Sequence, residues 1–354
     1  MIDTTTERKS LKEKTTFGQV VKFWLDNKII AGDCSQSTIK GYQTIATTLN
    51  KYFNENTPIE SLDPNLVERV FNHQMLNEKL KNGQIGYSNK SRRNFLFIFK
   101  KILKNAYVKA EVSFELYDRC KRIDLLLPKK KSAIKTEPYD MDMFDRAFKD
   151  AKCSEQKCIL LMYAISCCIG TRVSELLALK EDNYLDDRLE IHSAFVCGEI
   201  KSVKNDYSNR TIMMNGIAKK LLDNYLELSK PFRDRLSIVD NNRWLFFNPS
   251  KCVPWKNSDQ VYKFSKNVFR DLGIEKNFRG LKPTRHTCAT ESKRSSTEDE
   301  TLCAFIGHTN RMTTNLHYTG WRSVVRKAPE LDVDLPSMGW TGKKIHTGPL
   351  PISY

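Results

Sequence analysis

The chain has 354 residues, a formal net charge of +16 and 40% hydrophobic residues. That hydrophobic fraction allows packed cores and argues against wholesale disorder, and the length fits two ordinary domains better than one. So basic a chain is expected to have a polyanionic partner. No stretch approaches the roughly 20 apolar residues of a membrane span, and the polar first residues lack the apolar centre of a secretory signal. We therefore expect a cytoplasmic protein that binds nucleic acid and no membrane.

The ten cysteines are scattered and form no CxxC pair. Cys153 and Cys158 lie five residues apart, but no second pair or nearby histidine completes a zinc-binding set. We expect reduced thiols that act as small core residues, and no metal.

The first part of the chain predicts a helical bundle. Residues 1–15 are polar and are expected to be a flexible lead-in. Apolar residues at three- and four-residue spacing then predict helices that begin at Phe17 and cover 37–53, 64–76 and 89–110. Pro64 suits a first helical turn, and no strand pattern occurs. Residues 16–127 are therefore expected to form one domain.

Positive charge is concentrated in this domain and in the linker that follows. Residues 1–134 hold 24 Lys or Arg against 14 Asp or Glu, so ten of the sixteen net charges lie there. A charge run is usually a solvated face, but the bias across the whole bundle favours contact with DNA phosphates. The candidate contacts are Lys90, Arg92, Arg93, Lys100, Lys101 and Lys104 on one helix, and Lys129, Lys130 and Lys131 in the linker.

A basic linker is predicted at 128–138, where two prolines flank a lysine run without apolar periodicity. The lysine run fits a DNA-backbone strap as well as a nuclear-localisation signal. From 139 to 320, helices are expected at 139–151 and 155–168, in RVSELLALK, at about 215–229 and 257–271, and again between 284 and 318. A strand-rich stretch at 188–214 interrupts them. The fold class is thus mainly α with a small antiparallel β-sheet.

Three short motifs in this second part carry polar side chains that suit phosphate chemistry. In IGTRVSEL, Gly170 ends an apolar helix and Arg172 opens the next, where Glu175 could help to cap it. An arginine there can donate two charge-assisted hydrogen bonds to a phosphate, although a surface pair with Glu175 is the simpler interpretation. The other two motifs are KPTRHTCAT with Arg285, and FIGHTNRMTTNLHY with His308 and Tyr318.

Together these motifs resemble the tyrosine recombinase, or phage integrase, family. That family has an arginine in G-x-R-x-x-E-L, a helix H-x-L-R-H-T-x-A-T, an L-G-H loop and a nucleophilic tyrosine nine or ten residues later. The matching stretches are GTRVSEL, KPTRHTCAT, IGH and HY. The family's hairpin pattern K-T-x-x-S-x-R-x-I matches KNDYSNRTI, and its lysine falls on Lys204.

The resemblance implies an α+β catalytic domain that follows a helical (SAM-like) core-binding domain. It also implies DNA cleavage through a 3′-phosphotyrosine, without a cofactor. Arg172 and Arg285 would clamp the phosphate, Tyr318 would attack it, and His308 would donate to it or assist proton movement. Lys204 would protonate the departing 5′-oxygen.

One position departs from the family pattern. Lys282 stands where the family has the first histidine of H-x-x-R, so a proton-accepting role there is in doubt and a phosphate contact is expected instead. His286, which follows the arginine, is expected to be a packing or helix residue. Two rival nucleophiles are less favoured than Tyr318. Tyr354 is the terminal residue and is expected to be frayed, and Cys288 lies on the apolar side of a helix and is expected to be structural.

The resemblance further implies a homo-tetramer that recombines double-stranded DNA through a Holliday junction, as the integrase of a phage or other mobile element. Accessory DNA-bending or directionality proteins are further candidate partners. Residues 321–354 are expected to be a tail that docks on a neighbouring protomer, with a disordered end as the alternative. Alternatives for the whole chain are a cellular resolvase or invertase, a DNA-binding protein that has lost catalysis, and a type IB topoisomerase.

Overall fold

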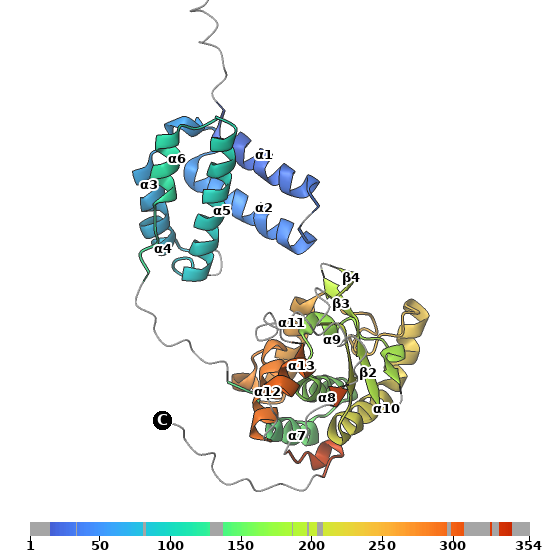
Figure 1. Cartoon of the computed structure of the whole chain (residues 1–354). Coiled ribbons are helices and arrows are strands. Elements are labelled where there is room, and N and C mark those ends of the chain that lie inside the picture. The colour runs from blue at the N-terminus through green and yellow to red at the C-terminus, as the bar shows by residue number, and fades with distance from the viewer. Residues whose placement is uncertain are drawn as a thin grey trace, which may run out of the picture. The chain divides into compact units, whose positions relative to one another are not determined.

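The computed structural model describes residues 15–32, 34–80, 83–127, 137–185, 187–196, 198–203, 208–295, 299–307, 326–327 and 333–341. The chain divides into two compact units, Met1–Ala133 and Ile134–Tyr354 (Figure 1). Each unit has its own hydrophobic core. The expected fold class, mainly α with small antiparallel sheets, is confirmed.

The described part of the first unit is helical. Hydroxyl side chains cap its longer helices: Thr16 forms a capping box with Gln19, and Ser35, Ser88 and Ser113 accept backbone N–H groups at the next three starts. Its elements are α1 (Phe17–Ile30), α2 (Gln36–Phe53), the 3₁₀ turn η2 (Ile59–Ser61), α3 (Pro64–Arg69), the π turn η3 (Val70–Gln74), α4 (Met75–Asn77), α5 (Asn89–Val108) and α6 (Phe114–Lys121).

Aromatic side chains form the centre of this unit. The ring of Phe99 lies 5.2–6.2 Å, between centroids, from those of Phe17, Phe53 and Phe71. These rings come from α1, α2, η3 and α5, so one cluster ties the bundle together. The short helix α6 was not predicted, because only two of its eight residues are buried and its apolar pattern is weak.

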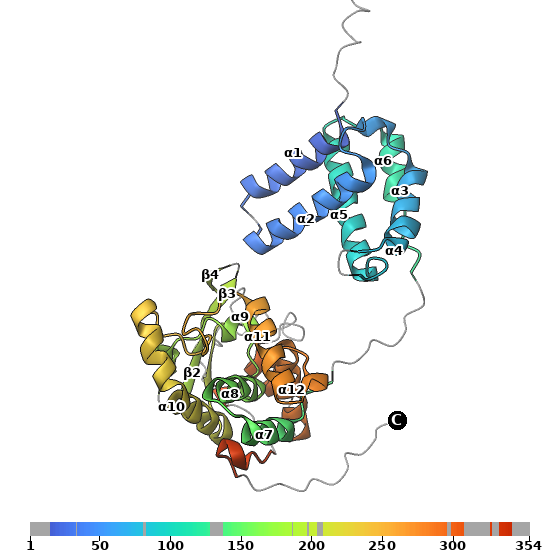
Figure 2. The ribbon, with the colours of Figure 1, turned by 180° about the vertical axis from the view of Figure 1, so that it is seen from behind.

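The second unit is built around one buried helix, α8. Its twelve residues from Cys158 to Ile169 are all buried, as expected for a helix that is apolar all round. Helices α7, α10, α11 and α12 contact it (Figure 2). The helices of this unit are α7 (Met141–Asp150), α8 (Ser154–Ile169), α9 (Val173–Leu176), α10 (Gly216–Val239), α11 (Ser258–Asp271), α12 (Lys282–Arg294) and α13 (Asp299–Ile306), with the 3₁₀ turns η4 (Glu181–Asn183), η6 (Glu275–Asn277) and η8 (Pro336–Met338).

One helical prediction needs correction. Helix α10 was expected to end at 229 but continues through Pro231 to Val239, because Leu236 still packs into a small core with Trp244 and Phe247. The helices expected between 284 and 318 correspond to α12 and α13 as far as the structure describes this range, and residues 308–318 lie outside the described part.

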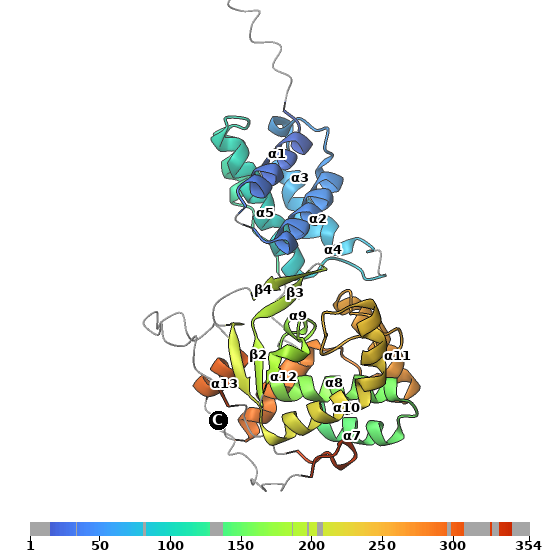
Figure 3. The ribbon, with the colours of Figure 1, turned by 90° about the vertical axis from the view of Figure 1, so that its right-hand side faces the viewer.

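The strands form two small sheets (Figure 3). Strands β3 and β4 make a separate antiparallel hairpin. The other sheet has the order β1-β2-β5-β6, in which β6 runs parallel to β5, unlike the antiparallel pairs elsewhere. The strands are β1 (Tyr184–Leu185), β2 (Arg188–Ile191), β3 (Ser193–Val196), β4 (Glu199–Ser202), β5 (Arg210–Met213) and β6 (Arg326–Lys327).

The described part of the C-terminal tail packs on its own unit. Leu335 and Met338 are fully buried, and the backbone N–H of Met338 donates to the Asp145 carboxylate on α7 at 3.0 Å. The Asn224 side chain on α10 bonds the Met338 carbonyl oxygen. Docking of the tail on a neighbouring protomer therefore stays a prediction for residues outside this segment.

Candidate active site

The turn between α8 and α9 positions Arg172. Gly170 ends α8 with φ of 62°, a left-handed conformation that glycine adopts without strain. A Cβ at this position would lie 3.0 Å from Cys288 Sγ and 3.0 Å from Ile306 Cγ2. The missing side chain therefore lets α12 and α13 approach the turn closely.

Arg172 connects three parts of the second unit. Its Nη1 donates to Glu175 Oε1 at 2.5 Å and to Ser208 Oγ at 3.1 Å, while Nη2 donates to the carbonyl oxygen of Gly307 at 2.9 Å. The backbone N–H of Arg172 donates to Glu175 Oε2 at 3.0 Å, so Glu175 caps α9 as predicted. The Arg172 side chain remains 38% exposed and so can be reached by a ligand.

Arg285 meets the same turn from α12. Its Nη1 donates to the Gly170 carbonyl oxygen at 2.8 Å, two residues before Arg172. Burial, together with the positive charges of Arg172 and Arg210, lowers the pKa of Arg285 to about 10. The two predicted arginines are thus brought together in a partly desolvated region of positive charge, which suits an anion.

The shifted pKa of Arg285 gives a testable expectation. An unperturbed arginine stays protonated beyond pH 12, whereas Arg285 should lose its proton as the pH rises through about 10. The folded protein holds this proton less tightly than the unfolded chain does. The free energy of unfolding should therefore rise as the pH climbs from about 10 toward the ordinary pKa of arginine, which applies in the unfolded chain. We expect one ¹³Cζ arginine resonance to titrate near pH 10, to vanish in Arg285→Met, and to titrate higher with bound DNA. An Arg285 resonance unchanged at pH 11 would contradict this.

Two residues of this site were missed by sequence reasoning. Arg210 on β5 has a fully buried side chain and pairs with Glu175 Oε2 at 3.1 Å. Ser208 accepts from Arg172 through its hydroxyl and from Arg210 through its carbonyl oxygen. Both belong to KNDYSNRTI, the stretch whose likeness to the family's hairpin pattern points to Lys204, so the same stretch carries the sequence signal for Ser208 and Arg210.

Lys282 is the first residue of α12 and is exposed. It precedes Arg285 by three residues, which puts both on one face of the helix. His286 is exposed as well and lies within α12, so of the two expected roles, packing or helix residue, the structure supports the second.

Lys204, His308 and Tyr318 lie outside the described residues. Described sequence neighbours of His308 and Lys204 do reach Arg172. Gly307, directly before His308, and Ser208, four residues after Lys204, both accept hydrogen bonds from its guanidinium.

Helix α5 of the first unit carries most of the predicted phosphate contacts. Lys90, Arg93, Lys101 and Lys104 are exposed, whereas Lys100 is half-buried with its Nζ 4.0 Å from Asp124 Oδ1. The lysines Lys129, Lys130 and Lys131 lie outside the described residues.

Arg92 cannot serve as a phosphate contact, and that prediction is wrong. Its side chain is fully buried and donates to the Phe71 carbonyl oxygen and to Asn89 Oδ1, both at 2.9 Å. A third bond reaches the Leu126 carbonyl oxygen at 3.4 Å. Arg92 therefore ties α5 to η3 and to the residues after α6.

We expect Arg92→Ala to lower the free energy of unfolding by about 2–4 kcal/mol, because it leaves a cavity and buried carbonyl groups without donors. Arg93→Ala, a matched change at an exposed position, should stay within about 0.5 kcal/mol of wild type. Chemical denaturation of the full chain measures both. An Arg92→Ala protein that unfolds like wild type but binds DNA more weakly would restore the original interpretation.

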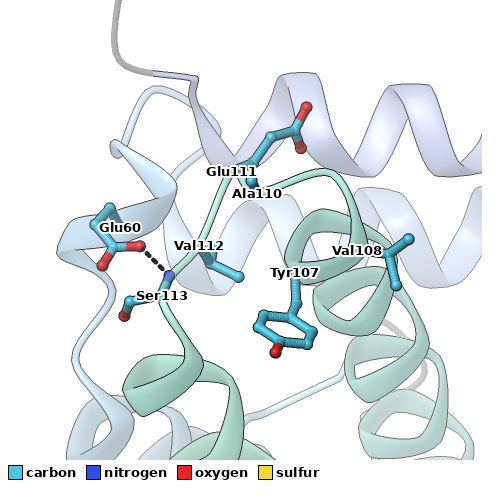
Figure 4. A pocket seen from close by; sticks show the side chains of 7 residues that line it. All are labelled: Glu60, Tyr107, Val108, Ala110, Glu111, Val112 and Ser113. Carbon is cyan, nitrogen blue, oxygen red and sulfur yellow. Dashed lines mark hydrogen bonds between the residues drawn. The ribbon is translucent and has the colours of Figure 1, made fainter.

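A hollow in the first unit lies where α5 leads into α6 (Figure 4). Tyr107 and Val108 line it, together with the carboxylates of Glu60 and Glu111. Glu60 Oε2 accepts the backbone N–H of Ser113 at 2.8 Å. The two acidic side chains make this hollow unsuited to a phosphate, so it is not part of the candidate site.

Within the described residues, no group of three or more His, Cys, Asp or Glu side chains could hold a metal ion. No helix in that part of the chain is both long and apolar enough to cross a bilayer.

Comparison with known proteins gives a family and a fold. The model of the phage integrase family matches residues 139–322. Among solved structures, the Tn1549 transposon integrase bound to a circular intermediate DNA superposes with a TM-score of 0.61 at 15% identity, covering 85% of this chain and 94% of that one. The lambda integrase tetramer bound to a Holliday junction gives 0.57 at 14% identity, covering 87% and 82%. No curated protein sequence matches the chain.

Proposed function

The chain belongs to the phage integrase family, the site-specific tyrosine recombinases that break and rejoin DNA, and we propose how its own residues perform that reaction. Arg172 and Arg285 clamp the non-bridging oxygens of the scissile phosphate, and Lys282 adds a third contact from the same face of α12. The observation that supports this best is the meeting of the two arginines at the α8–α9 turn. Fixed cations placed where charge develops stabilise a phosphoryl-transfer transition state.

The proposed chemistry is a transesterification that needs no external energy source. The phenolic oxygen of Tyr318 forms a bond to phosphorus, the bond to the 5′-oxygen breaks, and Lys204 gives that oxygen its proton. His308 takes up the phenolic proton, or donates to the phosphate while the phenolic proton passes to solvent. The 3′-phosphotyrosine keeps the bond energy, so a 5′-hydroxyl can reverse the step and join a strand.

We further propose that the reaction partner is double-stranded DNA at a core site in the cytoplasm, acted on by a homo-tetramer through a Holliday junction. Structures of the same fold hold a circular intermediate DNA, transposon right end DNA or a Holliday junction, which supports an integrase of a mobile element. Accessory DNA-bending or directionality proteins are proposed as further partners. A resolvase or invertase of the same family would share the chemistry and differ in its sites.

A nicked suicide substrate tests the proposal. The short strand that follows the scissile phosphate diffuses away after cleavage, so a recombinase should leave a covalent protein–DNA adduct on a denaturing gel. A DNA-binding protein without catalysis would shift the DNA on a native gel and trap no adduct. Relaxation of supercoiled DNA by a monomer would instead favour a type IB topoisomerase.

The first unit is proposed as the core-type DNA-binding domain, with the exposed basic residues of α5 against the phosphates. Replacing Lys104 with glutamine should weaken binding equally on all sequences and reduce the slope of log affinity against log salt by about 1. Lys51→Gln is the matched control, since Lys51 is already paired with Glu78. Fluorescence anisotropy over a salt series measures both, and equal slopes for Lys104→Gln and wild type would remove α5 from the interface.

A further inference from the structure

Arg210 is a buried cation to which the reaction proposed above assigns no role. Its side chain is 0% exposed, so it cannot touch DNA directly. Nη2 donates to Glu175 Oε2 and Nη1 to the Ser208 carbonyl oxygen, each at 3.1 Å. These two bonds fix the position of its charge beside Glu175.

Glu175 is shared between two arginines. Arg172 approaches it with a backbone N–H at 3.0 Å and with Nη1 at 2.5 Å, and Arg210 approaches the carboxylate from β5. Two positive charges therefore face one negative charge in a region where Glu175 is only 2% exposed. Interactions between charges are strong in such a desolvated place, so the balance among the three groups determines how much charge Arg172 can offer to a ligand.

Arg210 gives the carboxylate a second positive partner. Burial raises the pKa of Glu175, but the charge of Arg210, together with the hydrogen bonds and charge of Arg172, opposes this, and the pKa ends below its ordinary value. Without Arg210, the same carboxylate would pair with Arg172 alone and cancel its charge.

We propose that Arg210 is a positioning residue for DNA cleavage, which balances Glu175 so that the charge of Arg172 remains available to the scissile phosphate. This inference rests on the proposed function. A purely structural ion pair is the competing explanation, although buried pairs contribute little stability because desolvation offsets their attraction.

Two suicide substrates separate these explanations. One carries an ordinary scissile phosphodiester, and the other an uncharged methylphosphonate at the same position, which reduces the need for positive charge. Arg210→Met should form adduct about 10–100-fold more slowly on the phosphodiester, less than the ~10²–10³-fold expected for loss of a direct donor. On the methylphosphonate it should lie within a few-fold of wild type.

A second variant tests the charge balance itself. The double variant Arg210→Met/Glu175→Gln no longer has the excess negative charge. Its rate of adduct formation on the phosphodiester should therefore return most of the way from the Arg210→Met rate to the wild-type rate. Arg210→Lys, which keeps the charge, should cleave nearly as fast as wild type. If Arg210→Met fails to fold, these two variants still test the balance, because both keep Arg172 free of an uncompensated carboxylate.

Arg233→Met is the matched control, since Arg233 is another mostly buried arginine of this unit and pairs with Glu181 away from the site. Arg233→Met should lower the free energy of unfolding and should change the rates of adduct formation on the two substrates by the same factor. Equal losses on both substrates for Arg210→Met, or a double variant no faster than the single one, would overturn the proposal and leave Arg210 a structural residue. Absence of any adduct with wild-type protein would instead overturn the proposed function.

Discussion

A Tyr318→Phe variant is expected to bind core-site DNA as well as wild type and to form no covalent adduct. Phenylalanine keeps the ring but lacks the oxygen that would attack phosphorus, so the reaction loses its nucleophile. Loss of a nucleophile lowers the rate by at least ~10⁴-fold, which on a suicide substrate amounts to no detectable adduct. Single-turnover assays on end-labelled DNA, with binding followed by anisotropy, measure the two properties separately.

Tyr354→Phe is the matched control. It removes the same hydroxyl from the rival tyrosine at the end of the sequence and should leave adduct formation unchanged. Mass spectrometry of the trapped peptide identifies the modified residue directly. An adduct that persists in Tyr318→Phe, or that maps to another residue, would refute the assignment of the nucleophile.

The arginine pair could be predicted because local sequence determines it. The apolar run before Gly170 predicts a buried helix, and glycine predicts its end, so Arg172 had to stand at the following helix start. Arg285 lies on a helix with its own recognisable motif. What the sequence could not provide was the contact between them, which depends on α12 packing against the end of α8.

The helical position of Arg92, and not its charge, determines that it is buried. Arg92 precedes Phe95 by three residues and Phe99 by seven, so the spacing puts it on the buried face of α5. The carbonyl oxygens that satisfy its guanidinium come from Phe71 and Leu126, which are far away in the sequence. A charged residue in a buried stripe therefore indicated an internal anchor, but its partners could be found only in the structure.

Non-local pairing explains the other omissions. Strand β6 has two residues and joins the sheet through Ile212 and Met213 of β5, more than a hundred positions earlier. The tail segment around Met338 is held by Asp145 and Asn224, which lie 193 and 114 positions earlier in the sequence. Neither segment has a periodic pattern of its own, so tertiary contacts alone determine their structure.

Arg285→Ala should impair cleavage more than it impairs binding. The guanidinium is proposed to act on charge that develops at the phosphate in the transition state, so its loss should lower the single-turnover rate by ~10²–10³-fold. Binding depends on many phosphate contacts and should change far less. Arg285→Lys should recover only part of the rate, because lysine cannot supply two parallel hydrogen bonds.

The matched control for Arg285 is Arg279→Ala. Arg279 lies six residues earlier and bonds Glu137 at the start of the second unit, so its loss should leave the cleavage rate nearly unchanged. The rate of adduct formation at saturating protein, together with the dissociation constant, separates catalysis from affinity. If Arg285→Ala weakens binding and leaves the saturated rate intact, then Arg285 contributes affinity only, and Arg172 remains as the single described arginine that can stabilise the transition state.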